Sequence, residues 1–244
     1  MKQNIKCLLA YSGARYHGWQ KTRMGPSIEE ELQKSLVQIL QHPIKLQAAS
    51  RTDRGVHAEG QVVNFFTGKK DLCLKKIHYS LNQLLPNDLS ILNIEEVEET
   101  FHPTLHAKGK EYHYKVCNAP YQLPFHREFS WHYSYPLQLD LMDKGAKLLV
   151  GKQDFSAFTT VRYADAVRTV LDVKISSDEG SLLIRVRGEN FLYKMVRNIV
   201  GTLLHIGAGK IPLEELPLIL SSKKRALAGV TAPAHGLCLK EVFY

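Results

Sequence analysis

The order in which strand-like and helix-like segments alternate limits the fold of this chain more than any single motif does. Residues 27–40 carry apolar side chains every three to four positions, with Ser27 as a suitable N-cap, Glu30 three residues later and Pro43 after the end. A second such segment stops at Pro86. Runs rich in β-forming residues surround both helices. The predicted order is strand–helix–strand–strand–helix–strand, over residues 4–11, 27–40, 45–50, 61–66, 74–85 and 89–97.

This order is that of the ferredoxin-like fold, and the rest of the chain repeats it with insertions. Strands are predicted at 107–118, 166–176, 181–187 and 236–243, and helices at 140–150, with Asp140 as its cap, and 190–206, with Asn190 as its cap. We therefore expect an α/β (α+β) protein of two ferredoxin-like halves, residues 1–103 and 104–244. Their mixed, mainly antiparallel sheets would lie side by side around a central cleft, and residues 101–106 would form the hinge.

Composition and charge narrow the class of partner. The 244 residues are 44% hydrophobic and 23% charged, which is ordinary for a soluble globular protein, and the net charge of +8 suits a polyanion such as nucleic acid. The N-terminus is expected to be a first strand and not a signal peptide, and no segment is apolar enough to span a bilayer. The four cysteines form no C-x-x-C pair, so we expect reduced, mostly buried thiols in the cytoplasm.

The segment at residues 50–66, SRTDRGVHAEGQVVNFF, places one carboxylate between two guanidinium groups. Asp53 lies between Arg51 and Arg54, and Gly55 permits a sharp backbone turn directly afterwards. Strands are predicted on both sides, so Asp53 should lie on a tight loop held by a sheet, which is a common place for catalytic residues. A salt-bridged surface turn is the alternative.

The run from Arg51 to Val62 resembles the signature of the tRNA pseudouridine synthase A family, in which the aspartate of this motif is catalytic. The similarity extends over nearly the whole chain. Residues 151–158 resemble a further family element, although Gln153 replaces its usual histidine, and Arg54 stands where the family often has a small residue. The family's fold of two α/β halves related by a pseudo-two-fold axis agrees with the predicted order of elements.

The resemblance implies an isomerase that converts uridine to pseudouridine at positions 38–40 of the tRNA anticodon stem-loop. It implies that Asp53 is the catalytic carboxylate and that Arg197 is its basic partner. The alternative for Arg197 is a helix arginine that faces solvent. It implies that Tyr112 stacks on the target uracil and that Arg51 helps to displace this base from its stack. The alternative for Tyr112 is a tyrosine in the core, and the alternative for Arg51 is a contact with a phosphate. It also implies a homodimer. The chemistry requires no metal and no other cofactor.

Other classes of protein fit less well. His57 and Glu59 match the H-x-E of zinc deaminases, but the P-C-x-x-C that should follow is absent. His102 and His106 have no further ligands near them in the sequence. A loop at residues 12–20 holds Tyr16 and Trp19, which could stack on bases or pack within the protein. A non-catalytic tRNA-binding protein or chaperone remains the main alternative, because it would explain the positive charge.

Overall fold

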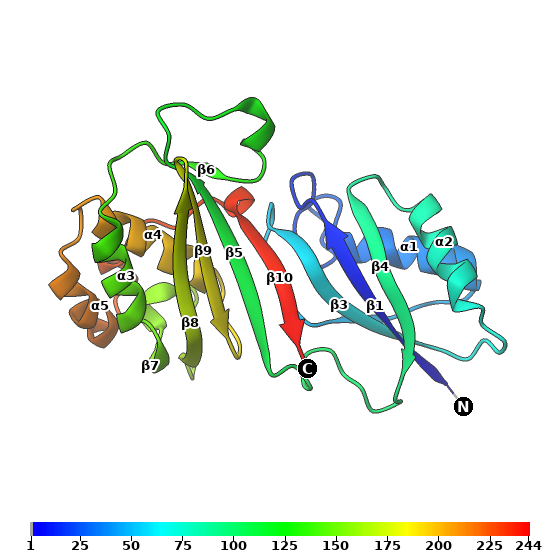
Figure 1. Ribbon diagram of the computed structural model, residues 1–244. Coiled ribbons are helices and arrows are strands. Elements are labelled where there is room, and N and C mark those ends of the chain that lie inside the picture. Colours follow the sequence, from blue (N-terminus) through cyan, green and yellow to red (C-terminus); the bar gives the residue numbers. More distant parts are fainter. Residues whose placement is uncertain (1) are drawn as a thin grey trace. The chain divides into compact units, whose positions relative to one another are not determined.

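The computed structural model describes residues 2–244 and confirms a mixed α/β fold whose strands pair mainly in antiparallel fashion. The chain divides into two compact units (Figure 1). The first unit comprises Met1–Lys108 with Leu239–Tyr244, and the second comprises Gly109–Cys238. The last strand, β10 (Leu237–Phe243), therefore begins in the second unit and continues in the first.

The first unit follows the predicted strand–helix–strand–strand–helix–strand order. Its sheet has the strand order β4–β1–β3, made of β4 (Leu89–Val97), β1 (Gln3–Tyr11) and β3 (His57–Thr67), and β2 (Leu46–Ala48) pairs with β3. Each of these pairings is antiparallel. This arrangement is the ferredoxin-like one, with Leu239 and the residues after it adding a strand segment next to β3.

The two helices of the first unit, α1 (Ile28–Leu40) and α2 (Leu74–Leu84), contact each other and lie together on one side of the sheet (Figure 1). The Ser27 hydroxyl accepts the N–H of Glu30 at 3.3 Å, so the predicted cap of α1 is confirmed. Leu32 and Leu36 of this helix are fully buried, and the predicted apolar face is therefore part of the core.

The second unit has the strand order β5–β9–β8–β7. These are β5 (Gly109–Cys117), β9 (Ser181–Gly188), β8 (Val167–Asp178) and β7 (Gly151–Asp154), and the two-residue β6 (Trp131–His132) pairs with β5 in parallel. The helices α3 (Leu139–Leu148), α4 (Met195–Gly207) and α5 (Leu216–Ser222) pack together on this sheet (Figure 1).

Two predicted helix starts were wrong. Helix α4 begins at Met195 and not at Asn190, because Lys194 adopts a left-handed conformation with φ 58° and ψ 7° that interrupts a helix. The apolar residues before it, such as Leu192, are buried from an irregular segment. Helix α3 has Gln138 as its cap, so Asp140 lies inside its first turn, where a negative charge suits the helix dipole.

None of the helices in the described part of the chain is long and apolar enough to cross a membrane. All four cysteines are free thiols, but only Cys7 is buried, so the expectation of mostly buried thiols was wrong. Cys73 is exposed because it precedes α2 at the surface.

Candidate active site

Asp53 lies on the predicted tight loop between β2 and β3, and its side chain is half-buried. Gly55 has φ +79°, a left-handed conformation, and the N–H of Val56 donates to the Asp53 carbonyl at 3.1 Å to close the turn. Arg51 and Arg54, on either side, are both exposed. The loop thus holds the carboxylate at the protein surface without leaving it fully in water.

The backbone before Asp53 is held by groups from distant parts of the first unit. The Tyr11 hydroxyl and Thr52 Oγ1 are 2.8 Å apart, and the Trp19 N–H donates to the Thr52 carbonyl at 3.0 Å. The Gln61 amide donates to the Ser50 carbonyl at 2.6 Å and accepts the Ser50 N–H at 3.2 Å. Because these bonds are buried, they restrict the loop to one conformation.

A close backbone approach adds to this restraint. Gly18 has φ +97°, and a Cβ atom at this position would lie 2.7 Å from the Thr52 carbonyl oxygen. Trp19 and Tyr16 of the same segment are buried, and the Tyr16 hydroxyl donates to Asp88 Oδ1 at 2.6 Å. The structure therefore favours the packing role of these two rings and not stacking on bases.

Tyr112 is in the second unit, on β5, and only 7% of its surface is exposed. Its ring lies edge-on to that of Phe191, with centroids 5.4 Å apart. Two residues on, the Tyr114 hydroxyl donates to the Pro233 carbonyl at 2.8 Å. Burial raises the pKa of Tyr114 strongly, and the nearby Arg197 charge opposes that rise, so Tyr114 remains a neutral donor.

Arg197 is also in the second unit, in the first turn of α4, and is half-buried. Its Nε donates to the Ala232 carbonyl at 2.7 Å, while the Ala232 N–H donates to the Arg197 carbonyl at 3.1 Å. Burial lowers the pKa of His235, and the Arg197 charge lowers it further, so the histidine is favoured in its neutral form. The guanidinium is thus oriented by main chain, and it is not a freely moving surface arginine.

The four predicted site residues therefore fall into two pairs: Asp53 with Arg51 in the first unit, and Tyr112 with Arg197 in the second. No group of three or more His, Cys, Asp or Glu side chains that could hold a metal occurs among residues 2–244. His57 Nδ1 accepts the Gly13 N–H at 3.1 Å, and Glu59 pairs with Lys240. Both side chains of the H-x-E match therefore make contacts with other residues of the first unit.

Comparisons with known proteins cover almost the whole chain. A family model described as tRNA pseudouridine synthase matches residues 8–104 and 146–244. The tRNA pseudouridine synthase A 2 of Protochlamydia amoebophila (strain UWE25) is 54% identical over an alignment 247 residues long, which covers 99% of this chain and 94% of that protein. The tRNA pseudouridine synthase A of Thermoanaerobacter sp. (strain X514) is 41% identical over 99% of this chain and 100% of that protein, and that of Bacillus pumilus (strain SAFR-032) is 38% identical over 98% of each.

The chain belongs to the tRNA pseudouridine synthase A family. Its most specific stretch, from Arg51 to Val62, lies inside the matched residues, as does Arg197. Tyr112 lies between the two matched ranges, in a part of the chain that the full-length relatives cover.

In this family member the sequence did not reveal the residues that fix α4 and hence Arg197. Residues 229–232, here called the strap, run along α4. Asn198 is fully buried; its amide donates to the Phe158 carbonyl at 2.6 Å, and its Oδ1 accepts from Thr231 at 2.6 Å and from Arg225 at 2.9 Å. The one signal available in the sequence was Gly201 in the middle of a helix, which is unfavourable unless another backbone lies close.

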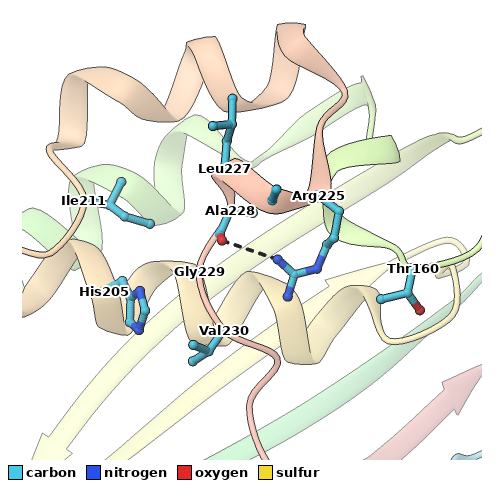
Figure 2. A pocket seen from close by; sticks show the side chains of 9 residues that line it. Thr160, His205, Ile211, Arg225, Leu227, Ala228, Gly229 and Val230 are labelled. Carbon is cyan, nitrogen blue, oxygen red and sulfur yellow. Dashed lines mark hydrogen bonds between the residues drawn. The ribbon is translucent and has the colours of Figure 1, made fainter.

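A hollow of about 550 Å³ lies beside the strap (Figure 2). It is lined by Thr160, His205, Ile211 and residues 225–230, and the Arg225 guanidinium donates to the Ala228 carbonyl at 3.3 Å beside it. None of the predicted site residues lines this hollow.

Gln153, which replaces the usual family histidine, has a clear structural contact. Its side-chain amide donates to the carbonyls of Leu148 and Val150, at 2.9 and 3.2 Å. Leu148 is the last residue of α3, where helix carbonyls lack partners within the helix, and Val150 lies two residues beyond it. Gln153 therefore joins β7 to the end of α3.

Proposed function

We propose that this family member isomerises uridine to pseudouridine in tRNA, at positions 38–40 of the anticodon stem-loop. The observation that carries the proposal is the Asp53 loop, in which a half-buried carboxylate stands in the family motif on a backbone fixed by Tyr11 and Gln61. Full-length similarity to proteins named tRNA pseudouridine synthase A supports the substrate class.

The proposed mechanism assigns one role to each predicted residue. The reaction breaks the glycosidic bond, turns the uracil and joins its C5 to the sugar C1′. Asp53 supplies the carboxylate, either as a nucleophile at the sugar C1′ or at the base C6, or as a base that takes a proton from the sugar. Arg197 supplies the positive charge that favours the ionised carboxylate. Tyr112 stacks on the uracil, and Arg51 helps to displace it from its stack.

We also propose that the enzyme works in the cytoplasm as a homodimer, as the family resemblance implies. Light scattering of the purified protein over a range of concentrations tests the second point. A mass of one chain at all concentrations would contradict it.

The reaction itself is tested with tRNA that carries tritium at uridine C5. Isomerisation must release this tritium to water, whereas a non-catalytic tRNA-binding protein retains it in the RNA. We expect release by the wild-type protein, and no release by Asp53→Asn, with tRNA affinity within a few-fold of wild type. Asp143→Asn on α3, an exposed position in the second unit, is the matched control and should behave as wild type. Turnover by Asp53→Asn near the wild-type rate would show that Asp53 is not the catalyst.

The role of Arg197 is tested by single-turnover pH–rate profiles. In Arg197→Met the carboxylate loses the support of its charged form, so activity at neutral pH should fall and part of it should return as the pH rises. Arg197→Lys should lie between Met and wild type, because a lysine keeps the charge but not the two-pronged geometry. If Arg197→Met retained both the wild-type rate and profile, Arg51 or Arg54 would become the better candidate.

A further inference from the structure

The segment between β5 and α3 exposes more large apolar side chains than any comparable length of the described chain. Phe125 is 87% and Tyr121 is 73% exposed, and Leu123 and Tyr135 are each about half exposed. We call residues 118–135 the aromatic lobe; Figure 1 shows it extending from the end of β5 as a loop that carries β6. Large exposed apolar patches on soluble proteins commonly mark interaction sites.

The aromatic lobe has an ordered backbone, so its rings are held in place. The Gln122 amide donates to the Ser130 carbonyl at 2.8 Å and to its hydroxyl at 3.0 Å, which closes the loop across eight residues. The Ser130 hydroxyl donates to the His126 carbonyl at 2.9 Å, and the Asn118 amide donates to the carbonyls of Tyr133 and Tyr135. Phe125 is therefore exposed on a loop whose backbone is already ordered, so binding through this ring does not require the loop to lose much conformational entropy.

A row of three rings runs along the C-terminal part of the lobe. Trp131, Tyr133 and Tyr135 follow one another with centroids 5.0 and 5.3 Å apart. The last ring, Tyr135, is exposed, and Lys210 Nζ lies 3.5 Å from its centroid. Exposed rings beside a cation are the combination by which proteins bind single-stranded nucleic acid.

The charges around the lobe also suit RNA. Arg127 is exposed, and its side chain makes no hydrogen bond or ion pair with any described residue. Glu128 is the one acidic residue between 118 and 135. Arg127 in the lobe and Lys210 over the Tyr135 ring are therefore two permanent cations in this part of the protein.

We propose that the aromatic lobe is an RNA-binding surface, on which Tyr121 and Phe125 stack with unpaired bases of the tRNA while Arg127 and Lys210 contact its phosphates. The proposal rests on the proposed function for the identity of the RNA. It adds a contact outside the residues that the family model matches, since these end at 104 and resume at 146.

A second copy of this chain fits the lobe less well. In a two-fold symmetric dimer the same patch faces itself, so the interface would contain two copies of Arg127 and two copies of Lys210. Like charges brought together in this way repel, and the lobe offers one carboxylate to offset them. RNA supplies the opposite charge and the flat apolar surfaces at once.

The experiment measures the affinity of the full-length protein for unmodified transcribed tRNA at several salt concentrations. Phe125→Ala should weaken binding about tenfold at every salt concentration, with an unchanged slope of log K against log [salt], because stacking releases no counterions. Arg127→Gln should instead reduce that slope by about 0.7–0.9. Tyr79→Ala is the matched control, since this ring of α2 is 68% exposed, and it should bind as wild type.

Phe125→Trp provides a conservative variant whose emission is measured as the difference from the wild-type protein, which contains Trp19 and Trp131. It should retain wild-type affinity, and its emission should be quenched when tRNA binds and a base stacks on the indole. The sedimenting mass of each variant is also measured at one protein concentration, to detect any change in oligomeric state.

Three results would overturn the proposal. One is unchanged tRNA affinity in Phe125→Ala, and another is a Phe125→Trp protein whose emission does not change when tRNA is added. The third is a change of sedimenting mass in Phe125→Ala without loss of affinity, which would assign the lobe to a second copy. Tritium release by the wild-type protein is measured in parallel, so failure of the proposed reaction is distinguished from failure of the lobe to bind RNA.

Discussion

Replacing Gly201 by alanine should destabilise the second unit, although the same change stabilises most helices. Alanine is favoured over glycine in a helix interior by about 1 kcal/mol. At Gly201, however, the new methyl group would overlap the Val230 carbonyl oxygen and lie 2.8 Å from its carbonyl carbon. Both atoms belong to the backbone of the strap, so no side-chain rotation relieves the clash.

The magnitude follows from how far the strap must move. Carbon atoms in ordinary contact are about 3.5–4.0 Å apart, so the carbonyl carbon alone requires the strap to retreat by roughly 1 Å, and the overlapping oxygen requires more. The Gly229 N–H donates to Thr202 Oγ1 at 2.9 Å and the Ala232 N–H to the Arg197 carbonyl at 3.1 Å, and a retreat of this size breaks both bonds. Each buried donor left without a partner costs about 1–3 kcal/mol. After the gain in helix propensity, the net loss is about 1–5 kcal/mol.

Thermal unfolding measures this loss, since 1 kcal/mol corresponds to roughly 2–4 °C in a chain of this size. Gly145→Ala in α3 is the matched control: the nearest atom to its new methyl group is Leu203 Cδ2 at 3.1 Å, the end of a flexible side chain. It should therefore change the melting temperature little. A Gly201→Ala protein that melts at or above the wild-type temperature would refute the reasoning.

Two further predictions concern ionisable groups. Burial raises the pKa of Asp154, but hydrogen bonds from Lys223 and Ser156 outweigh it and lower the pKa to about 2. The ionised carboxylate therefore stabilises the folded protein at pH values above its unfolded pKa of about 4. The difference in melting temperature between wild type and Asp154→Asn should shrink as the pH falls from about 5 towards 2. A difference that grows as the pH falls would contradict this. Burial raises the pKa of Cys7 to about 12, whereas Cys73 is exposed. After brief alkylation at pH 8, mass spectrometry should therefore find Cys73 labelled and Cys7 labelled only in denaturant. Labelling of Cys7 in the folded protein would contradict its burial.

Local signals made most of the first unit predictable. The cap at Ser27 and the strand Leu89–Val97 agree with the structure because hydrophobic periodicity and cap residues act over a few positions. Strand β3 is longer than predicted, since it begins at His57. His57–Gly60 contains weak strand formers, but Ala58 pairs with Tyr11 of β1, and such a partner is invisible in a local window.

The residue types of the site could be predicted from the sequence, but the residues that hold the site in place could not. The sequence predicted a tight loop for Asp53, and the structure has that loop between β2 and β3. The groups that fix the loop, Tyr11 and Trp19, come from more than thirty residues away, and Trp19 could equally have been a base-stacking ring. Sequence spacing carries no information about such distant pairings.

Both candidate catalytic groups are held by close backbone contacts, and this decides where function is sensitive to substitution. Gly18 allows its segment to reach the Thr52 carbonyl beside Asp53, and Gly201 allows the strap to reach α4 beside Arg197. In each case the position of the charged side chain depends on a residue that has no side chain. A polar contact can be weakened in steps by conservative substitution, whereas a backbone contact has no room for any added atom. Substitutions at Gly18 and Gly201 should therefore impair both stability and the geometry of the site, even though neither residue can touch the substrate chemically.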